Sequence, residues 1–293
     1  MGLGGGGHSR LGMAKQKSEA ETIRIIQGAL DAGVNFIDTA EAYGTEAVVG
    51  LGIADRPRDQ LILSTKKSPR SGLGEDEIRS SVERSLRNLG TDYIDIYHLH
   101  GVPRQDYASI VEQAYPVLDL LRQEGKIRFI GITERFERDT DHSMLEKALD
   151  DDLFDVVMVG FNLLNQSARR SILKRTQQLD VGVLIMFAVR RALSNPARLA
   201  EVIAQLTADK QVANLPEDGA LDFLVAEGAA ASIPDAAYRF CKHEKGVHVV
   251  LSGTSNIDHL ADNVRSLEGG ALPSPTLHRL YEMFGEVDSV SGS

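Results

Sequence analysis

The 293-residue sequence contains one cysteine, Cys241, and no run of about 20 apolar residues. One thiol cannot form an internal disulfide, and a metal motif that needs several cysteines is excluded. His243 and His248 follow Cys241 closely, but no second Cys/His pair accompanies them, so we predict no zinc or other metal site. The lack of a long apolar run argues against a transmembrane helix.

The sequence has fewer basic than acidic residues. Lys and Arg total 32 against 42 Asp and Glu, which gives a formal net charge of −10 at pH 7. Binding to nucleic acid or to an anionic membrane needs a basic face, so neither partner is expected, although a local basic pocket for a phosphate is not excluded. The first ten residues are rich in glycine and do not resemble a secretory signal, so we expect a cytoplasmic protein.

Short apolar runs rich in Val and Ile recur along the sequence. They cover residues 34–38, 61–65, 93–99, 127–132, 154–159, 181–187 and 247–251, and an eighth can begin at residues 1–3. Nearly continuous apolar runs of this length indicate strands covered on both faces, which is typical of a parallel sheet.

Amphipathic helix patterns separate most of these strands. Ser18, with Glu21 three residues later, predicts a capped helix start, and Gly33, Gly90 and Gly125 mark predicted helix ends. The helices are predicted over residues 18–32, 75–89, 107–123, 143–149, 167–178, 233–243, 257–267 and 275–284. Strand–helix units of about 30 residues build either a (β/α)8 barrel or an open doubly wound sheet, and periodicity favours the barrel without deciding.

The length is compatible with one domain or two, because barrels commonly reach about 250 residues as one domain. We predict a single α/β domain over residues 1–293. Residues 188–234 are longer and less regular than the other connections, as expected of an elaborated loop with helices after the seventh strand. Residues 288–293 are small and polar, and we expect them to be frayed.

Four residues with acid–base chemistry stand where predicted strands end. Asp38 closes one strand, Tyr43 follows in the next loop, Lys66 closes the next strand and His100 ends the one after it. In a barrel these strand ends share one rim, where barrel active sites lie. His98 points to the same side of its strand as His100, and the pattern alone does not choose between them.

Together these side chains can protonate a carbonyl oxygen. A tyrosine phenol has a pKa of roughly 10 and keeps its proton at neutral pH. We expect the ammonium of Lys66 to lower the pKa of Tyr43, Asp38 to hold Lys66 in place, and His100 to orient a carbonyl group. Taken singly, each residue has an ordinary structural explanation as a cap or as packing. Because no side chain delivers a hydride, the set predicts a cofactor that does.

Five motifs in order resemble those of one enzyme family. Residues 36–44 (FIDTAEAYG) closely resemble the aldo-keto reductase signature around its catalytic Asp and Tyr, and residues 63–66 (LSTK) resemble its lysine strand. Residues 92–100 (DYIDIYHLH) resemble its histidine strand, whose final histidine is catalytic. Residues 124–132 (EGKIRFIGI) are similar to its fifth strand, and residues 251–255 (LSGTS) with Asn263 are similar to its cofactor loop.

The resemblance implies a (β/α)8 TIM barrel and a role for each acid–base residue. Tyr43 would be the general acid/base, Lys66 its pKa-lowering partner, Asp38 the partner of Lys66, and His100 the residue that orients the carbonyl. The implied activity is NAD(P)H-dependent reduction of an aldehyde or ketone to an alcohol, or the reverse oxidation of a sugar or alcohol.

The resemblance also implies a site for NADP(H), with NAD(H) as an alternative. The implied contacts to its phosphate and adenine come from the loop after the eighth strand and the following helix: Ser252, Gly253, Thr254, Ser255, Asp262 and Asn263. Asn256 stands where the family often has an Arg for the 2′-phosphate, which leaves the choice between NADP and NAD open.

The nicotinamide side of the site departs from the family pattern. Thr133 and Glu134 replace the usual Ser-Asn pair, and Met158 replaces a Gln. Thr133 is still expected to contact the cofactor. The aromatic platform corresponds to Met186 or Phe187, and we prefer Phe187 because its ring can stack.

Several features allow two interpretations. The glycine run at residues 4–7 either lines the cofactor pocket or is a flexible terminus, and Arg190 and Arg191 either bind the pyrophosphate or form a solvated pair. The N-terminal hairpin that is usual in this family has no counterpart, so the chain is either truncated or its true start lies upstream.

Two other function classes are weighed against the reductase. The departures at Thr133, Glu134 and Met158 are compatible with a nicotinamide-binding regulatory or sensor protein with little catalysis, although all four acid–base residues are present. A metal-dependent barrel hydrolase is a third alternative, but the sequence has no ligand cluster for it. The substrate is a small carbonyl or alcohol compound, selected by loops such as residues 101–105 and the stretch after residue 188.

Overall fold

The computed structural model describes residues 1–7, 10–213, 215–216 and 219–293. Within these residues, eight strands pair in parallel in sequence order and close into a barrel. The strands are β1 (Gly2–Gly4), β2 (Phe36–Asp38), β3 (Ile62–Lys67), β4 (Ile94–Val102), β5 (Ile127–Glu134), β6 (Val156–Gly160), β7 (Gly182–Met186) and β8 (Val249–Ser252). The predicted (β/α)8 barrel is confirmed, because an open sheet would leave β1 and β8 unpaired.

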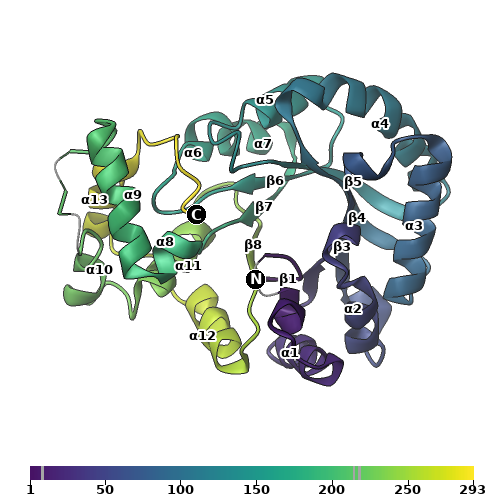
Figure 1. Ribbon diagram of the computed structural model, residues 1–293, viewed down its shortest axis with the longest axis horizontal. Helices are drawn as coiled ribbons and strands as arrows, with labels where there is room; N and C mark the ends of the chain where they lie inside the picture. Colours follow the sequence, from purple (N-terminus) through teal and green to yellow (C-terminus); the bar gives the residue numbers. More distant parts are fainter. Residues whose placement is uncertain (8–9, 214, 217–218) are drawn as a thin grey trace.

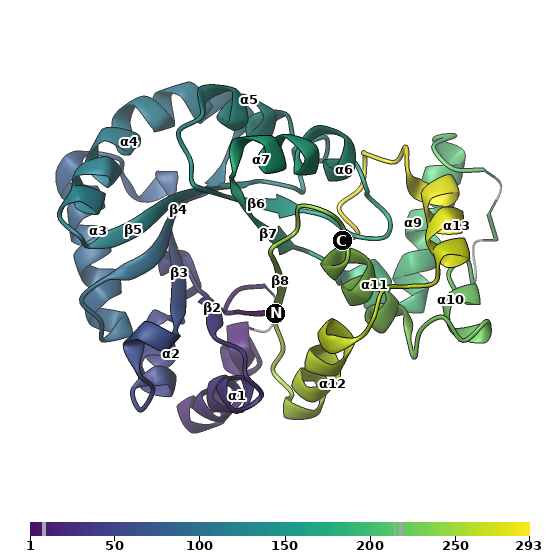
Figure 2. The same ribbon diagram turned by 180° about the vertical axis from the view of Figure 1, so that it is seen from behind.

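Helices surround the barrel, as Figure 1 shows. They are α1 (Glu19–Asp31), α2 (Glu46–Ile53), α3 (Glu75–Leu89), α4 (Tyr107–Gln123), α5 (Ser143–Asp151), α6 (Ala168–Ser171), α7 (Leu173–Leu179), α8 (Arg191–Ser194), α9 (Pro196–Ala208), α10 (Phe223–Ala226), α11 (Ile233–Lys242), α12 (Ile257–Glu268) and α13 (Ser274–Phe284). Both views place α9, α10 and α13 together at one side of the molecule (Figures 1 and 2). Among the described helices, none is long and apolar enough to cross a membrane.

The start of α1 forms as the sequence predicts. Glu21 N donates to Ser18 Oγ over 3.3 Å, and Ser18 N donates to Glu21 Oε2 over 2.9 Å, which is the reciprocal capping box. Gly90 ends α3 in the left-handed conformation at φ 66°, where a side chain would be strained. These two local signals fix where the first and third helices lie relative to the barrel.

Helix α2 is the clearest element that the sequence does not predict. It contains Gly50 and Gly52, and glycine disfavours a helix interior by about 1 kcal/mol relative to alanine. In the structure a Cβ at Gly50 would collide with Asn88 O at the end of α3. The glycine therefore allows α2 and α3 to pack closely, and that tertiary contact outweighs the poor propensity.

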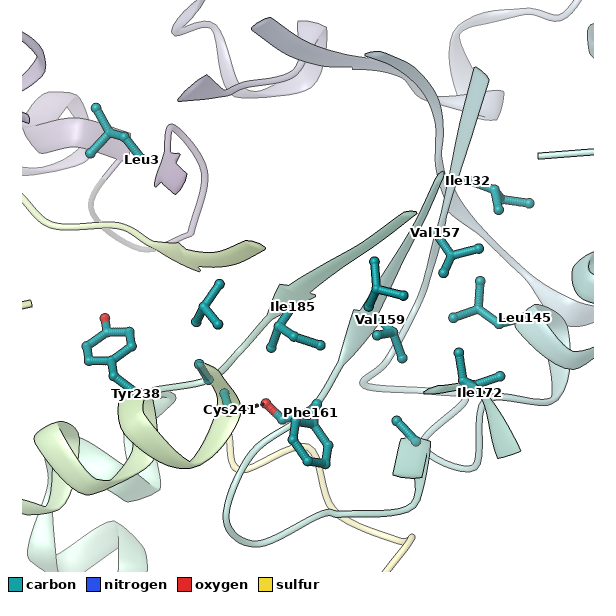
Figure 3. Packing of buried hydrophobic residues seen from close by; sticks show 14 of the residues in the cluster. Leu3, Ile132, Leu145, Val157, Val159, Phe161, Ile172, Ile185, Tyr238 and Cys241 are labelled. Atoms are coloured by element: carbon teal, nitrogen blue, oxygen red, sulfur yellow. Dashed lines mark hydrogen bonds between the residues drawn. The ribbon is translucent and has the colours of Figure 1, made fainter. Parts of the chain in front are cut away.

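The core has two layers, separated by the wall of the barrel. Figure 3 shows the outer layer, in which Val157 and Val159 of β6 lie beside Ile185 and face the helices. The inner layer fills the lower part of the barrel with Phe36, Ile96, Val156, Met158 and Leu184. Because side chains alternate along each strand, the next inward positions toward the carboxyl ends carry the polar groups of the site.

The amino end of the barrel is only partly covered. Ile62 and Phe129 are in register with the inward-facing Phe36 and Ile96 and are 38% and 43% exposed. No strand or helix precedes β1 in the residues that the structure describes.

The expectation that residues 288–293 are frayed is wrong. Asn165 Nδ2 donates to Val290 O over 2.9 Å, and Asn162 Nδ2 donates to Ser291 O over 3.1 Å. Both asparagines are buried, and a buried amide needs an acceptor. The backbone carbonyls of the tail provide these acceptors, which holds the tail against the loop after β6.

Candidate active site

The four predicted acid–base residues converge at the carboxyl end of the barrel. Asp38 is the last residue of β2, and Lys66 and His100 lie near the ends of β3 and β4. Tyr43 stands in a short turn after β2 that closes at Gly44, whose φ is 69°. These three neighbouring strands bring together side chains up to 62 positions apart in the sequence, counted from Asp38 to His100.

Asp38 and Lys66 form a buried ion pair. Lys66 Nζ donates to both carboxylate oxygens of Asp38 over 2.6 Å and to Thr39 O over 2.6 Å. Ser64 Oγ donates to Asp38 Oδ1 over 2.7 Å, so the carboxylate is also held from the neighbouring strand. Burial lowers the pKa of Lys66 and the charge of Asp38 opposes this shift. The predicted pairing of Asp38 with Lys66 is present.

Tyr43 and His100 form the second pair. Tyr43 Oη lies 3.3 Å from His100 Nε2, and the two rings meet edge to face with centroids 5.3 Å apart. Burial lowers the pKa of His100 to about 3, with the charge of Lys66 adding to the shift, so its imidazole is neutral at neutral pH. A neutral imidazole has one N–H donor and one acceptor nitrogen, which suits it to orient an oxygen atom.

The pKa of Tyr43 shifts in the opposite direction to our expectation. Burial raises it, and the charge of Asp38 raises it further. Lys66 Nζ lies 5.2 Å from the centroid of the Tyr43 ring, but its charge is neutralised by Asp38 at 2.6 Å. The expected lowering is therefore not seen in the protein without ligands, because desolvation and the nearby carboxylate outweigh the paired ammonium.

The glycine run at the end of β1 packs directly against this site. A Cβ at Gly6 would lie 2.6 Å from the ring of Tyr43, and Gly5 N donates to Asp38 O over 2.6 Å. Gly4, Gly6 and Gly7 line the same cavity as Tyr43. Of the two interpretations of residues 4–7, the structure supports the lining of a pocket, since only a glycine fits against the tyrosine.

A cavity of about 1120 Å³ opens at this end of the barrel. Ten of the twelve predicted site residues line it: Asp38, Tyr43, His100, Thr133, Phe187, Gly253, Thr254, Ser255, Asp262 and Asn263. Lys66 and Ser252 do not reach the cavity, because Lys66 is fully buried with Asp38 and Ser252 is buried at the end of β8. One continuous space therefore joins the acid–base residues to the predicted cofactor loop.

The loop after β8 is held by a small polar network. Asn263 Nδ2 donates to Ser252 Oγ over 2.9 Å, and the hydroxyl of Tyr238 lies 2.9 Å from the same oxygen. Burial raises the pKa of Tyr238 to about 12, so its hydroxyl stays protonated. Asn256 caps α12 by accepting a hydrogen bond from Asp258 N over 2.8 Å. Residues 253–255 thus lie just before the N-terminus of α12, where backbone N–H groups favour an anion. The sequence had not indicated Tyr238.

A sequence model described as the aldo/keto reductase family matches residues 1–282 of this fold. The chain belongs to this family. The protein is therefore an NAD(P)-dependent oxidoreductase of the aldo-keto reductase type, and the resemblance inferred from its motifs is confirmed.

Individual relatives match this chain over most of their length. A D-threo-aldose 1-dehydrogenase from Pseudomonas sp is 27% identical, and the match covers 84% of this chain and 83% of the relative. An aldo-keto reductase from Bacillus halodurans in its holo form is 23% identical with a TM-score of 0.72, over 99% of this chain and 92% of that one. One from Klebsiella pneumoniae, solved with NADP and acetate, is 24% identical with a TM-score of 0.69, over 98% and 91% of the two chains.

This aldo-keto reductase has a buried network where the family pattern is broken. Glu134 accepts from Gly160 N over 2.7 Å, and His142 Nδ1 lies 3.0 Å from both of its carboxylate oxygens. Ser167 Oγ lies 2.8 Å from His142 Nε2. Burial raises the pKa of Glu134, while the carboxylate raises the pKa of His142 against the effect of burial. The sequence did not indicate His142, because nothing in its local pattern distinguishes it from a surface loop residue.

Thr133 is likewise engaged within the protein. Its Oγ1 accepts a hydrogen bond from Gly101 N over 2.7 Å and so ties the end of β5 to the end of β4. Met158 of β6 belongs to the apolar layer inside the barrel. The side chains of Thr133, Glu134 and Met158, where the sequence differs from the family pattern, therefore stabilise the aldo-keto reductase barrel itself and also line the cavity.

Phe187 and Met186 occupy different surroundings at the end of β7. Met186 packs with the apolar residues inside the barrel, whereas Phe187 follows the strand with a left-handed φ of 66°. The guanidinium carbon of Arg190 lies 3.8 Å from the centroid of the Phe187 ring. Arg190 also pairs with Glu137 and donates to Ser293 Oγ over 2.8 Å. Arg190 thus covers one face of the ring that we expected to stack on the nicotinamide, and it is not part of a solvated pair.

Cys241, His243 and His248 do not come together. Cys241 is buried, burial raises the pKa of its thiol, and Sγ donates to Phe161 O over 3.4 Å (Figure 3). His243 Nε2 lies 2.9 Å from Gly269 O, and His248 Nδ1 accepts from Val183 N. Within residues 1–7, 10–213, 215–216 and 219–293, no group of three or more Cys, His, Asp or Glu side chains is arranged to hold a metal ion.

Proposed function

We propose that this aldo-keto reductase reduces an aldehyde or ketone to an alcohol, or catalyses the reverse oxidation of a sugar or alcohol, with Tyr43 as the general acid/base. The observation that supports this best is the Tyr43–His100 pair. The hydroxyl and the imidazole lie 3.3 Å apart and both line the large cavity. A carbonyl oxygen that approaches both groups meets a proton donor and an orienting group at once.

Lys66 and Asp38 assist the proposed proton transfer from Tyr43. Tyr43 keeps its proton at neutral pH, since burial raises its pKa, and the protonated phenol is the form that can donate to a carbonyl oxygen. As that proton leaves, negative charge develops beside Lys66, which Asp38 holds within 5.2 Å of the ring. A fixed ammonium stabilises such a charge without reorganising during the reaction.

We propose NADP(H) as the cofactor, with NAD(H) as the alternative. The bound NADP of the Klebsiella pneumoniae relative supports this choice. The residues of this chain fit a dinucleotide, because a Cβ at Gly253 would lie 3.0 Å from Gly4 O and the glycine leaves room for a close backbone approach. Thr254 and Ser255 follow just before Asn256, the N-cap of α12, and phosphate groups bind favourably near a helix N-terminus. When bound, the nicotinamide supplies the hydride. Fluorescence titration with NADPH and NADH tests the choice.

Replacing Tyr43 with phenylalanine tests the proposed activity. The variant should bind NADPH as the wild type does but lose about 10²- to 10⁴-fold in turnover, the range of general acid catalysis. Tyr115→Phe is the matched control, because Tyr115 packs on Phe154 away from the cavity and should keep its turnover. Reduction at near wild-type rates by Tyr43→Phe would refute the role of Tyr43 as general acid/base.

One group of observations favours a nicotinamide sensor with little catalysis. Glu134 is bonded to His142, and Arg190 covers one face of the Phe187 ring. These two side chains, at positions where the family contacts the nicotinamide, are therefore already occupied within the protein. Following NADPH consumption across a panel of aldehydes and ketones separates the two functions. Tight NADPH binding without consumption of any carbonyl compound would favour the sensor.

We further propose that residues 1–293 form a single domain in the cytoplasm. The barrel closes within one chain, and the family match spans residues 1–282. A single free thiol, Cys241, suits a reducing compartment. Limited proteolysis that releases two separately folded fragments would contradict the first part, and localisation of a tagged protein outside the cytoplasm would contradict the second.

A further inference from the structure

The cavity is positively charged although the protein as a whole is acidic. Six basic side chains line it: Lys15, Lys17, Arg135, Arg138, Arg190 and Arg191. Each of the four acidic side chains that line it has a basic partner, in the pairs Asp38–Lys66, Glu134–His142, Glu137–Arg190 and Asp262–Arg265. An excess of one sign of charge in a cavity concentrates ligands of the opposite sign. The formal net charge of −10 therefore lies elsewhere on the surface, and the cavity favours anions.

Arg135 lies beside the strand that carries His100. It follows Glu134, the last residue of β5, and β5 is paired with β4, which bears His100. A Cβ added to Gly101, the residue after His100, would lie 3.4 Å from Arg135 Cγ. The stem of Arg135 thus lies over Gly101, and Arg135 lines the same cavity as Tyr43.

The guanidinium of Arg135 has no partner among the residues that the structure describes. It makes no side-chain hydrogen bond and no ion pair there, in contrast to Arg190, which binds both Glu137 and Ser293. Arg135 is also half-buried, so part of its hydration is already lost. A partly desolvated and unpaired guanidinium binds a carboxylate strongly, because its planar fork matches the two oxygens.

The backbone on both sides of Arg135 is fixed. Glu134 is held by His142 and Gly160 N, and Phe136 is buried, with its ring stacked on His142 at a centroid distance of 5.4 Å and an interplanar angle of 7°. A charged group on an anchored backbone loses less entropy on binding than one on a free loop. The Glu134–His142 network therefore also positions Arg135.

A second positive charge, that of Arg10, acts on Tyr43. Arg10 follows β1, and its charge lowers the pKa of Tyr43, although burial and Asp38 raise it by more. Its side chain makes no ion pair within the described ranges. Arg10 therefore adds positive charge near Tyr43, although it does not line the cavity.

We propose that the substrate of this reductase is a carbonyl compound that carries a carboxylate, and that Arg135 is the residue that binds the carboxylate. The inference rests on the proposed function, since it names the substrate class of the same site. The phosphates of the cofactor do not account for Arg135, because the predicted phosphate loop follows β8, and β6 and β7 separate β8 from β5 in the barrel. Arg135 selects the substrate and takes no part in proton transfer.

The test compares carboxylated aldehydes with neutral analogues of similar shape. The probes are 4-carboxybenzaldehyde against 4-nitrobenzaldehyde, and succinic semialdehyde against butanal, which place the carboxylate at two distances from the carbonyl. Wild type should prefer the carboxylated member of at least one pair in kcat/KM. Arg135→Gln should lose about 10- to 100-fold in kcat/KM for that member, mainly through KM, because the contact is the same in substrate and transition state. Its activity with the neutral member should change by less than about threefold.

Two further variants sharpen the result. Arg135→Lys keeps the charge but not the fork and should restore part of the preference. Arg87→Gln is the matched control, because Arg87 is an exposed arginine of α3 and does not line the cavity. NADPH affinity should be unchanged in all three variants, which separates substrate binding from cofactor binding.

A second measurement keeps the inference separate from catalysis. Binding of 4-(hydroxymethyl)benzoate and of benzyl alcohol to the NADP⁺ complex can be followed by calorimetry. If Arg135→Gln loses binding of 4-(hydroxymethyl)benzoate but keeps binding of benzyl alcohol, the proposal is supported even when no aldehyde is reduced. The absence of aldehyde reduction would refute only the proposed activity. Equal losses for charged and neutral probes, or a wild-type preference for the neutral member of both pairs, would overturn the proposal.

Discussion

Replacing Asp38 with asparagine removes the negative charge that faces Lys66 and keeps the shape of the side chain. In the wild type, Lys66 Nζ has three acceptors at 2.6 Å, two from Asp38 and one from Thr39 O. Lys66 is 0% and Asp38 is 3% exposed, so water cannot replace the lost carboxylate. The substitution therefore leaves a buried ammonium with two neutral acceptors, the new amide oxygen and the carbonyl of Thr39, and with no counter-charge.

The expected loss of stability follows from this geometry. Two unit charges 2.6 Å apart attract by about 6 kcal/mol at an effective dielectric constant of about 20. Desolvation of both groups offsets part of that attraction, and removing one partner of a buried pair typically costs about 3–5 kcal/mol. We expect Asp38→Asn to lower the free energy of unfolding by about that amount at neutral pH.

The loss should depend on pH. Burial lowers the pKa of Lys66, and Asp38 is the largest influence that opposes it, so the pKa falls further in the variant. The folded variant then keeps Lys66 neutral at a pH where the unfolded chain, with a lysine pKa of about 10.4, still binds the proton. Stability therefore rises with pH up to about 10.4, by at most about 1.4 kcal/mol per pH unit.

Denaturant unfolding of Asp38→Asn and of wild type, from about pH 7 to about pH 9, measures this slope. Adding Lys66→Met to Asp38→Asn removes the amine, so the extra slope should disappear and part of the stability should return. A loss below about 1 kcal/mol, the same slope in the single and double variants, or additive effects of the two substitutions would refute the reasoning.

Two more predictions concern the same end of the barrel. Burial lowers the pKa of His98 well below its usual value, and the charges of Lys66 and His100 contribute to the shift. Below about pH 6.5 the unfolded chain therefore takes up a proton at this histidine that the folded protein does not. Stability should fall as the pH drops from about 6.5 to about 5, and His98→Gln should reduce that fall by up to about 1.4 kcal/mol per pH unit in urea unfolding; an unchanged slope would contradict this. Gly6→Ala should push a methyl group into the Tyr43 ring and reduce turnover at least about tenfold, whereas Gly270→Ala, where a Cβ would meet nothing within 4 Å, should leave turnover unchanged; equal rates for the two variants would count against the contact.

The sequence predicts most of the barrel because its signals are local. Buried parallel strands need continuous apolar runs, and the ends of α1 and α3 are set by Ser18, Glu21 and Gly90. The convergence of Asp38, Tyr43, Lys66 and His100 is also predictable, since all strand ends of a barrel share one rim.

The remaining features depend on contacts between distant segments. The raised pKa of Tyr43 reflects burial by the folded barrel, which no motif encodes. Gly50 looks like a helix breaker until α3 is placed beside it. The bond between Glu134 and His142 and the stacking of Arg190 on Phe187 likewise arise only when separate loops meet.

The distribution of the site around the barrel has a consequence for how the protein can be altered. The proposed acid–base residues come from the consecutive strands β2, β3 and β4, whereas the proposed nucleotide contacts come largely from the loops after β7 and β8. The two groups share the cavity but no strand. Replacing the loop between β8 and α12 should therefore change the nucleotide preference. The proposed proton-transfer residues on β2, β3 and β4 should keep their positions.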